Sequence, residues 1–505
     1  MTAPRVTVRM YTGLLGDCFL IRLFEDRPNL DRKKPADFNI LIDCGIIQGE
    51  KDGKDRIRQV AASISEICDK RLDLVVVTHE HYDHLCGFGL AKDIFLEDPE
   101  FTIEQLWLAW TEDPTDPDAR RLRGIFEQSR LAIEAGIQRI AARGSDGGRG
   151  FFLDGQAKGL DSFTDPLGAR ASGQLTGREI IAALKRKAGA VNYLTPGQAV
   201  ETSEEIAKPA LRAFVLGPPK KPDRLFKDLP TKANPETYLA AREAGARTTA
   251  SNFVDAPDRK TFANMPFGAP YQQFSDTELL DPGLFDPELL NPPLKATAAQ
   301  HNLWDIRQKY MIIEDGVQGS VEARRIDGDW QGAVGALAIK LDSDTNNSSL
   351  VLAFELAEGG PVMLFAADAQ VGNWLSWHDQ TYPAANGEQL TATDLLGRTV
   401  LYKVGHHGSH NATLRQRGLE LMTDDGLVAM LPLDQAMADR REWPFAHKEM
   451  YERLEELTKL RILWGDRPIA PEVIAADPDF ARRIRQCPGK DDAAQSAPWI
   501  EFDVA

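Results

Sequence analysis

Short apolar runs recur along the first 80 positions and predict β-strands. Residues 5–24 are predicted to form two strands around the Gly-rich turn GLLGD, because β-branched and aromatic residues alternate with polar ones on either side of it. A third strand is predicted at Phe38–Ile42, followed by a helix around Arg56–Asp69. The run Leu72–Val77 is apolar throughout, as expected of a strand that is covered on both faces. The pattern therefore predicts a β-rich N-terminal part that contains a hairpin.

The middle of the chain has a different pattern, which predicts two insertions. Beyond Trp110 turn residues are frequent, and Ala119–Arg143 then has helical spacing, so we expect a mostly helical insertion over 111–187. Strand-like sequence returns within 188–219. Residues 220–334 are full of Pro, Asp and short apolar stretches, which predicts a second, irregular insertion.

Regular patterns return in the last third of the chain and predict both strands and helices. Helices are expected near 413–422 and 446–459. The predicted strands are Ala336–Leu341, Ser349–Phe354, Val362–Ala366, Val400–Val404 and Leu427–Leu431. Together with the N-terminal strands, these elements are typical of a layered α/β architecture.

Composition and charge restrict the class of protein. Of the 505 residues, 43% are hydrophobic and 27% are charged, as is usual for folded globular proteins. No apolar run reaches about 18 residues, and charges interrupt the N-terminal stretch where a signal peptide would be apolar, so we expect a cytoplasmic protein that does not cross a membrane. The formal net charge of −17 argues against a protein that coats long nucleic acid through bulk electrostatics. The five cysteines lack CxxC spacing and are expected to be reduced packing residues.

The segment THEHYDHLCG, directly after a predicted strand, carries the strongest chemical signal. It places His79, His81, Asp83 and His84 within six positions. Neutral imidazoles and a carboxylate are ligands that zinc, manganese and iron accept. Buried without a cation, such a cluster would leave several polar groups unsatisfied. The alternative, a surface loop that is rich in histidine by chance, fits poorly with nine histidines in the whole chain. The segment therefore predicts a metal site.

The spacing HxHxDH resembles the signature of the metallo-β-lactamase superfamily. In that family the first two histidines bind one metal ion, which assigns His79 and His81 to a first site. The aspartate and the last histidine bind a second ion, which assigns Asp83 and His84 to a second site. The remaining ligands of the family come from later loops.

This resemblance also implies a fold and a cofactor. The fold would be an α/β αββα sandwich whose core is built from 1–110, 188–219 and 335–505 around two large insertions. The chain would be a metal-dependent hydrolase that uses a metal-activated water. Two zinc ions are the expected cofactors, with manganese or iron as alternatives.

Two aspartates match further elements of the family. Asp43, in the strand end IDCG, looks like an aspartate that lies behind the ligands and accepts a hydrogen bond from a ligand imidazole. Its alternative is a simple turn residue. Asp368 looks like the aspartate that bridges two metal ions, although this chain has AAD where many relatives have GD.

Histidines near the end of the chain complete the expected site. In LYKVGHHGSH we expect His406 to be a metal ligand and His407 to face the substrate, although the sequence leaves open which is which. His447 stands where a subgroup of the family has a His-Pro, and is expected to contact a substrate phosphate or to protonate a leaving group. An ordinary histidine at a helix N-terminus is the alternative. Asp83 or Asp368 would orient the water, so Asp83, His407 and His447 are the expected catalytic residues.

Five short segments narrow the resemblance to one subgroup. GLLGDCFLIRL, VLGPP, NNSSLVLAFEL, FAADAQ and KVGHHGS together are similar to the soluble nuclease-like domain of ComEC-type DNA-uptake competence proteins. This similarity implies a phosphodiesterase or nuclease that acts on a phosphodiester or nucleic-acid substrate. It does not cover the two predicted insertions. Hydrolysis of a carboxylic ester, lactone, amide or thioester on the same metal centre is the alternative.

One family ligand has no obvious counterpart. Many members have a further ligand histidine between the HxHxDH loop and the bridging aspartate, and in that interval the chain has only His301, inside the second insertion. We expect solvent or an asparagine in that place, with Asn346 or Asn347 as the candidates. Without that histidine, the first metal site is expected to hold its ion less tightly than the family pattern implies.

The insertions leave room for other roles. The helical pattern in the first insertion carries many arginines, which are expected to form a solvated face or, alternatively, to hold an anionic substrate. The insertions are also the expected site for any protein partner. A non-catalytic scaffold is a third reading, but such a protein would tolerate loss of ligands, and nearly every ligand position is filled here.

Overall fold

The computed structural model describes residues 5–25, 35–48, 50, 52–142, 174–203, 210–227, 338, 340–409, 411–440, 447–487 and 497–504. The chain divides into two compact units. Met1–Glu127, Gly147–Ala244 and Ile339–Ala505 form the first, and Gln128–Asp146 with Gly245–Ala338 form the second. Apart from His301, which lies outside the described residues, every candidate site residue belongs to the first unit.

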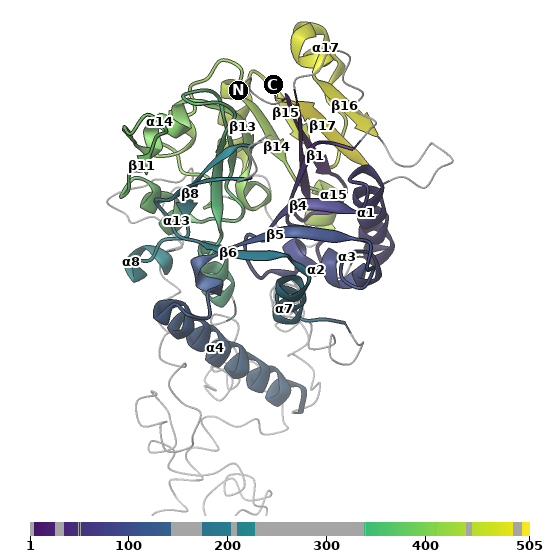
Figure 1. Cartoon of the computed structure of the whole chain (residues 1–505), viewed down its shortest axis with the longest axis vertical. Coiled ribbons are helices and arrows are strands. Elements are labelled where there is room, and N and C mark those ends of the chain that lie inside the picture. Colours follow the sequence, from purple (N-terminus) through teal and green to yellow (C-terminus); the bar gives the residue numbers. More distant parts are fainter. Residues whose placement is uncertain are drawn as a thin grey trace, which may run out of the picture. The chain divides into compact units, whose positions relative to one another are not determined.

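The first unit contains an eight-stranded sheet with the strand order β16-β17-β1-β2-β3-β4-β5-β6 (Figure 1). Its strands are β1 (Arg5–Tyr11), β2 (Phe19–Phe24), β3 (Phe38–Ile42), β4 (Arg71–Val76), β5 (Thr102–Ala109), β6 (Ala190–Leu194), β16 (Ile484–Cys487) and β17 (Trp499–Asp503). From β16 to β3 neighbouring strands are antiparallel, and from β3 to β6 they are parallel. The hairpin predicted over 5–24 is confirmed as β1 and β2.

The second sheet of this unit has the strand order β15-β14-β13-β10-β9-β8-β7. Its strands are β7 (Ala199–Glu201), β8 (Arg212–Gly217), β9 (Val351–Glu355), β10 (Val362–Phe365), β13 (Thr399–Lys403), β14 (Val428–Leu431) and β15 (Ile462–Trp464). Strands β10, β13, β14 and β15 run parallel, so their carboxyl ends share one edge. A separate pair, β11 (Tyr382–Pro383) and β12 (Gln389–Leu390), forms a two-stranded ribbon.

Helices cover the outer face of each sheet (Figure 1). One set packs on the first sheet: α1 (Gly53–Ile67), α2 (Tyr82–Leu90), α3 (Lys92–Phe95) and α7 (Gly177–Lys187). Another set packs on the second: α13 (Val371–Trp377), α14 (Ala392–Gly397), α15 (Gln435–Arg440) and α16 (Lys448–Thr458). The other described helices are α4 (Pro117–Ala142), α8 (Pro222–Leu225), α17 (Pro471–Ala476), α18 (Pro478–Arg482), η1 (Trp110–Glu112), η6 (Gly405–Gly408), η7 (Leu419–Leu421) and an unlabelled helix over 340–347. The predicted α/β fold of the metallo-β-lactamase type, with its αββα layers, is confirmed.

The side-chain alternation of each strand explains why the strands read as continuous apolar runs. In β4 and the residue after it, Leu74 and Val76 point into the core between the two sheets, whereas Val75 and Val77 point into the core under the helices. Successive side chains of a strand face opposite sides, so a strand buried on both faces needs apolar residues at every position. The sandwich therefore has three apolar layers, one between the sheets and one under each set of helices.

Two predicted elements are wrong. A strand was expected at Ala336–Leu341, but the described part of this stretch is helical, and the helix continues over 340–347. A helix was expected near 413–422, but the chain there forms turns and the short η7. Short apolar runs do not distinguish strand from helix, and Gly418 breaks the second pattern with φ −144° and ψ −101°.

Composition led to expectations about membrane-spanning helices and about the cysteines. No helix among them is long and apolar enough to cross a membrane. All five cysteines are free thiols, and Cys18, Cys44, Cys68 and Cys86 are buried, as expected of packing residues.

Candidate metal centre

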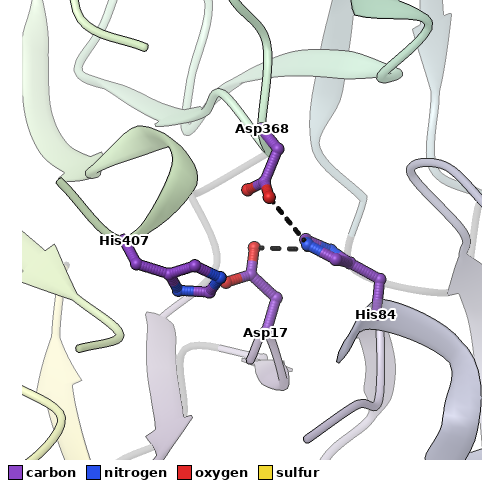
Figure 2. A group of neighbouring side chains, drawn as sticks. All are labelled: Asp17, His84, Asp368 and His407. Atoms are coloured by element: carbon purple, nitrogen blue, oxygen red, sulfur yellow. Dashed lines mark hydrogen bonds and ion pairs between the residues drawn. The ribbon is translucent and has the colours of Figure 1, made fainter. Parts of the chain in front are cut away.

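Loops from distant parts of the chain bring the candidate residues together. Asp17 comes from the loop between β1 and β2, and His84 lies in the first turn of α2. Asp368 follows β10, and His407 lies in η6 directly after β13. One ligand atom from each of these four buried residues lies within 4.8 Å of the others (Figure 2). We call this group the Asp/His cluster.

Within this cluster, contacts of His84 link the two sheets. Its Nε2 atom lies 3.1 Å from Oδ2 of Asp368, and its Nδ1 atom lies 3.7 Å from Oδ2 of Asp17. Asp83 joins the group from the other side, with its Oδ2 atom 3.3 Å from Nε2 of His407. The predicted convergence of the 79–84 loop with Asp368 and the histidines after β13 is therefore present.

Asp43 lies behind the cluster. Its Oδ2 atom is 2.7 Å from Nδ1 of His84 and accepts a hydrogen bond from Oγ1 of Thr78 at 2.6 Å, and its Oδ1 atom accepts from the Thr78 amide at 2.8 Å. A carboxylate so placed fixes the tautomer of a ligand imidazole, because Nδ1 of His84 carries the proton and Nε2 keeps its lone pair. Asp43 has the contact expected of a residue that orients a ligand.

His79 and His81 form a second group, which we call the His79/His81 pair. Because Thr78 donates its hydroxyl proton to Asp43, its oxygen accepts from Nδ1 of His79 at 3.0 Å, which leaves a lone pair on Nε2 of His79. Nε2 of His81 lies 3.3 Å from Oδ1 of Asp342, which places the proton there and the lone pair on Nδ1 of His81. These two lone-pair nitrogens face each other at 3.1 Å. A shared cation removes the repulsion between them, so the pair fits a metal ion.

The Asp/His cluster also carries an excess of negative charge. Asp17 and Asp368 of this cluster and the adjacent Asp43 and Asp83 are buried, and the one lysine among them, Lys403, forms ion pairs with Asp17 and Asp368. Buried charges require partners of opposite sign. The donor set of carboxylates and imidazoles is the one that divalent metals such as zinc and manganese accept. These residues fit a metal ion of that kind.

Protonation of His84 reports the same excess of charge. Burial alone lowers the pKa of His84, but the charges of Asp368, Asp17, Asp83 and Asp43 outweigh it and hold the pKa well above its usual range. By contrast, burial lowers the pKa of His79, and it lowers the pKa of His81 to about 4, so both remain neutral ligands.

Three residues in this region were missed by the sequence analysis. Lys403 is 2% exposed and forms ion pairs with Asp17 and with Asp368, whose Oδ1 atom lies 3.4 Å from the lysine nitrogen. Asp342 contacts His81. Asp17 follows a glycine and so reads as a turn residue, and Asp342 comes directly after the stretch 336–341 that was expected to form a strand. Lys403 and Asp17 both lie within quoted segments, LYKVGHHGSH and GLLGDCFLIRL, but their roles were not recognised.

His406 and His407 differ in how they are held. Nδ1 of His407 donates to the carbonyl of Pro432 at 2.8 Å, so its tautomer is fixed and Nε2 faces Asp83. Nε2 of His406 lies 3.9 Å from Oδ2 of Asp368, and its side chain is 18% exposed. His407 has the ligand-like contacts, and His406 also lies at the cluster. The assignment of His406 as the metal ligand and of His407 as the residue that faces the substrate remains a prediction.

His447 lies next to this turn. It precedes α16, and its backbone amide donates to the carbonyl of Gly408 at 3.1 Å. This bond ties the start of α16 to the segment that carries His406 and His407. The expected catalytic role of His447 remains a prediction, and its position beside that segment is compatible with it.

Left-handed backbone conformations gather at the centre. Asp43, Ala367, His406 and His407 have φ angles of 55°, 47°, 43° and 51°. Each such non-glycine residue costs roughly 1–3 kcal/mol and persists only where the surrounding structure enforces it. A glycine at the position of Ala367 would adopt this conformation without that strain.

Gly45 allows the loops to approach each other closely. A Cβ atom at this position would lie 2.1 Å from the backbone of Asp83 and 2.4 Å from the amide of His84. The adjacent amides of Cys44 and Asp17 donate to the carbonyls of His84 and Asp83 at 2.8 and 3.0 Å. The Asp-Cys-Gly and Gly-Asp motifs thus hold the start of α2 through its backbone.

The candidates for the missing family ligand are His301, Asn346 and Asn347. His301 lies outside the described residues. Both ends of the Asn347 side-chain amide have partners. Nδ2 donates to the Lys227 carbonyl at 2.7 Å, and Oδ1 accepts from the backbone amides of Gln370 and Asn373. Asn346 is fully buried, and its Oδ1 atom has no hydrogen-bond partner. Of the two candidate asparagines, only Asn346 keeps a donor atom available.

One comparison with known proteins agrees with this geometry. The family model of the metallo-beta-lactamase superfamily matches residues 30–154, which carry β3, β4 and the His79–His84 loop. No curated protein and no solved structure matches the chain.

Proposed function

We propose that this protein is a metal-dependent hydrolase that cleaves phosphodiester bonds in a nucleic acid or nucleotide. The superfamily domain and the Asp/His cluster support a metal-dependent hydrolase in general. The observation that carries the proposal further is that the two ligand groups adjoin, since the ring centroids of His79 and His84 are 4.1 Å apart. Two neighbouring ion sites suit in-line displacement at phosphorus.

The two groups would hold two ions in different ways. His79 and His81 would bind the first, and Asp83, His84 and Asp368 would bind the second. His406 would complete the second site, and His407 would face the substrate. When bound, zinc or manganese lowers the pKa of a water molecule toward neutrality and stabilises negative charge on a phosphoryl oxygen.

Side chains of the protein would move and orient the protons. Asp83 accepts a hydrogen bond at Oδ2 from Nε2 of His407, so this carboxylate is placed to orient the attacking water. Asp83 is suited to this task because its histidine partners outweigh the effect of burial and lower its pKa to about 2. Hydrogen bonding to Asp83 raises the pKa of His407 despite burial, so His407 can donate a proton to the leaving group. His447 is the second candidate donor.

A pocket beside the His79/His81 pair supports an anionic substrate. It is lined by His79 and Thr78 on one side and by Leu122, Phe126 and Arg123 of α4 on another. Arg123 belongs to the arginine-rich helical pattern; its guanidinium donates to the backbone carbonyls of Glu112 and Asp113 at 3.4 and 3.0 Å, and its remaining donors suit a phosphate. Glu80 and Glu112 line the same pocket, and burial raises the pKa of Glu112.

Similarity to the nuclease-like subgroup points in the same direction, whereas the net charge of −17 would repel a polyanion and favours a less charged substrate. Hydrolysis of a carboxylic ester, lactone, amide or thioester on this centre is therefore the second candidate function. The two classes differ in the bond that is attacked and can be separated directly.

The test uses the full chain, stripped with a chelator and reconstituted with Zn²⁺ or Mn²⁺. Hydrolysis of bis-p-nitrophenyl phosphate without activity on a panel of lactones supports the phosphodiesterase. The reverse result overturns it in favour of the carboxylic-ester hydrolase. The variants H81A and D368A should lose both bound metal and activity, whereas D93N, which changes a carboxylate exposed on the surface, should keep both. Retention of metal by both site variants would refute the proposed centre.

A further inference from the structure

The helix at 340–347 has one residue, Asp342, that contacts His81 and a second, Asn346, that contacts Asp342. Asp342 and Asn346 are separated by one helical turn, so they lie on the same face of this helix. Asp342 is 7% exposed and Asn346 is fully buried. The segment after the helix is fastened to the metal-site loop, because the amide of Leu350 donates to the carbonyl of Thr78 at 2.9 Å.

One carboxylate contacts both a predicted ligand and the amide of Asn346. Oδ1 of Asp342 lies 3.3 Å from Nε2 of His81. The Nδ2 atom of Asn346 lies 3.5 and 3.4 Å from the two oxygens of Asp342. Asp342 therefore fixes which nitrogen of His81 keeps its lone pair and also fixes which end of the Asn346 amide is the nitrogen.

The oxygen of that amide is the candidate for the donor that the first site lacks. Because Nδ2 of Asn346 is directed at Asp342, Oδ1 is the free end, and it is buried without a hydrogen-bond partner. Leaving a buried amide oxygen without a hydrogen-bond partner is unfavourable. A metal ion held by His79 and His81 would remove that cost by taking the oxygen as a third ligand.

We propose that Asn346 Oδ1 is the third protein ligand of the first metal ion, and that Asp342 is a positioning residue that orients both Asn346 and His81. This inference rests on the proposed metal centre. It replaces the usual third histidine by a neutral oxygen donor, so the first site has two nitrogens and one oxygen. Carbonyl oxygens suit manganese and magnesium better than a third imidazole does, which shifts the preference of this site toward Mn²⁺.

The experiment measures the number of ions bound per chain and their affinities, by elemental analysis and by titration of the chelator-stripped full chain with Zn²⁺ and with Mn²⁺. N346A should weaken one site at least 10-fold and leave the other unchanged. D342N should weaken the same site roughly 10–100-fold, as expected when a residue that orients a ligand is lost. D344N is the matched control on the same helix, since Asp344 pairs with Lys340.

The variant N346D distinguishes a ligand from a packing residue by the sign of its effect. If Asn346 binds the metal, the new carboxylate adds a charged ligand and should tighten the first site at least 10-fold. If Asn346 only packs, two carboxylates within contact distance repel each other, and N346D should lower the unfolding temperature in chelator without tightening metal binding.

Several results would overturn the assignment. N346A binding the ions as tightly as the parent chain would do so, and so would loss of an ion in H301A but not in N346A. A parent chain that binds two ions but hydrolyses neither test substrate refutes the proposed function and leaves the ligand assignment standing. A parent chain that binds no divalent metal refutes both.

Discussion

The Nδ1 atom of His84 lies 2.7 Å from Oδ2 of Asp43, although 41 residues separate them in the sequence. This contact leaves Nε2 of His84 free to face Asp368 at 3.1 Å. In D43N the amide nitrogen can donate to Nδ1 instead, which moves the proton to Nε2 and blocks the ligand atom. We expect D43N to lower metal affinity about 10–100-fold in a competition titration with a coloured chelator.

The matched control for that variant is D37N. Asp37 accepts a hydrogen bond from the Glu25 amide at 2.9 Å, at the entry to the same strand β3 and away from the ligands. It should bind metal as the parent chain does. Equal affinities for D43N and the parent would show that Asp43 serves only to close the turn.

Lys403 compensates part of the negative charge at the cluster. Burial alone lowers the pKa of Lys403, but Asp17 and Asp368 outweigh it and keep the ammonium charged. In K403M these carboxylates lose their counter-ion, so the metal-free protein should be destabilised by about 3 kcal/mol. A bound metal ion then neutralises more uncompensated negative charge in K403M than in the parent chain. Adding Zn²⁺ should therefore raise the unfolding temperature of K403M by more than it raises that of the parent chain. Thermal unfolding with chelator and with Zn²⁺ measures both effects.

For comparison, K70M changes a lysine that is 42% exposed and pairs with Asp98 and Glu100 on the surface. Exposed ion pairs contribute about 0–1 kcal/mol, so K70M should behave as the parent does in both conditions. An unchanged metal response in K403M would mean that the lysine does not act on the metal site.

Ala367 holds its left-handed backbone next to Asp368. In A367G the loss of roughly 1–2 kcal/mol of backbone strain offsets the usual cost of replacing Ala by Gly. We expect this variant to stay within about 1 kcal/mol of the parent in urea unfolding. A353G, which changes an equally buried alanine of β9 that is not in the left-handed region, should be the more destabilised of the two. Equal losses would indicate that the conformation of Ala367 carries no strain.

Glu501 gives the first sheet a pH-dependent contribution to stability. It lies on β17 and accepts ion pairs from Arg9 at 3.0 Å and from Arg485 at 2.8 Å. Burial alone would raise the pKa of Glu501, but Arg9, Arg485 and Arg22 outweigh it and lower the pKa below its usual value. A lowered folded-state pKa means that the stabilisation is complete above about pH 4.3 and is lost as the pH falls through the folded-state value.

The variant E501Q tests this contribution. Near pH 7 it leaves buried arginines without their partner and should destabilise the protein by about 3 kcal/mol in urea unfolding. The difference from the parent chain should shrink as the pH is lowered below about 4, where the parent carboxyl is itself protonated. E100Q, at an exposed glutamate, should show no such difference at any pH. A difference that stays constant with pH would refute the role of the charge.

The sequence predicted those parts of the fold whose signal is local. Strands β1 to β4 have alternating or continuous apolar runs bounded by Gly and Asp, and their predicted positions agree with the structure to within one residue. The ligand candidates of the HxHxDH loop were found for the same reason, since four residue types at fixed spacing are visible in one short segment. The helix at 340–347 was missed because its short apolar start suits either conformation.

The rest of the candidate site depends on contacts that no local pattern encodes. Lys403 reaches Asp17 and Asp368 only after two sheets have packed together. The same holds for Asp342 and His81, which are more than 250 positions apart in the chain. A single sequence shows charged residues but not their partners. It could therefore not reveal that Lys403 forms ion pairs with two aspartates of the cluster or that Asp342 contacts His81.

Pairing of β1 with β17 has a consequence for how the protein is made. Thr7 of β1 lies opposite Asp503, and the amide of Thr12, at the start of the loop that carries Asp17, donates to the carbonyl of Pro498 at 3.1 Å. Almost 500 positions separate these partners, so during synthesis the first strand emerges long before its neighbour exists. Until β17 has emerged the loop that bears Asp17 lacks its support, and a nascent chain should acquire its metal site only after that point.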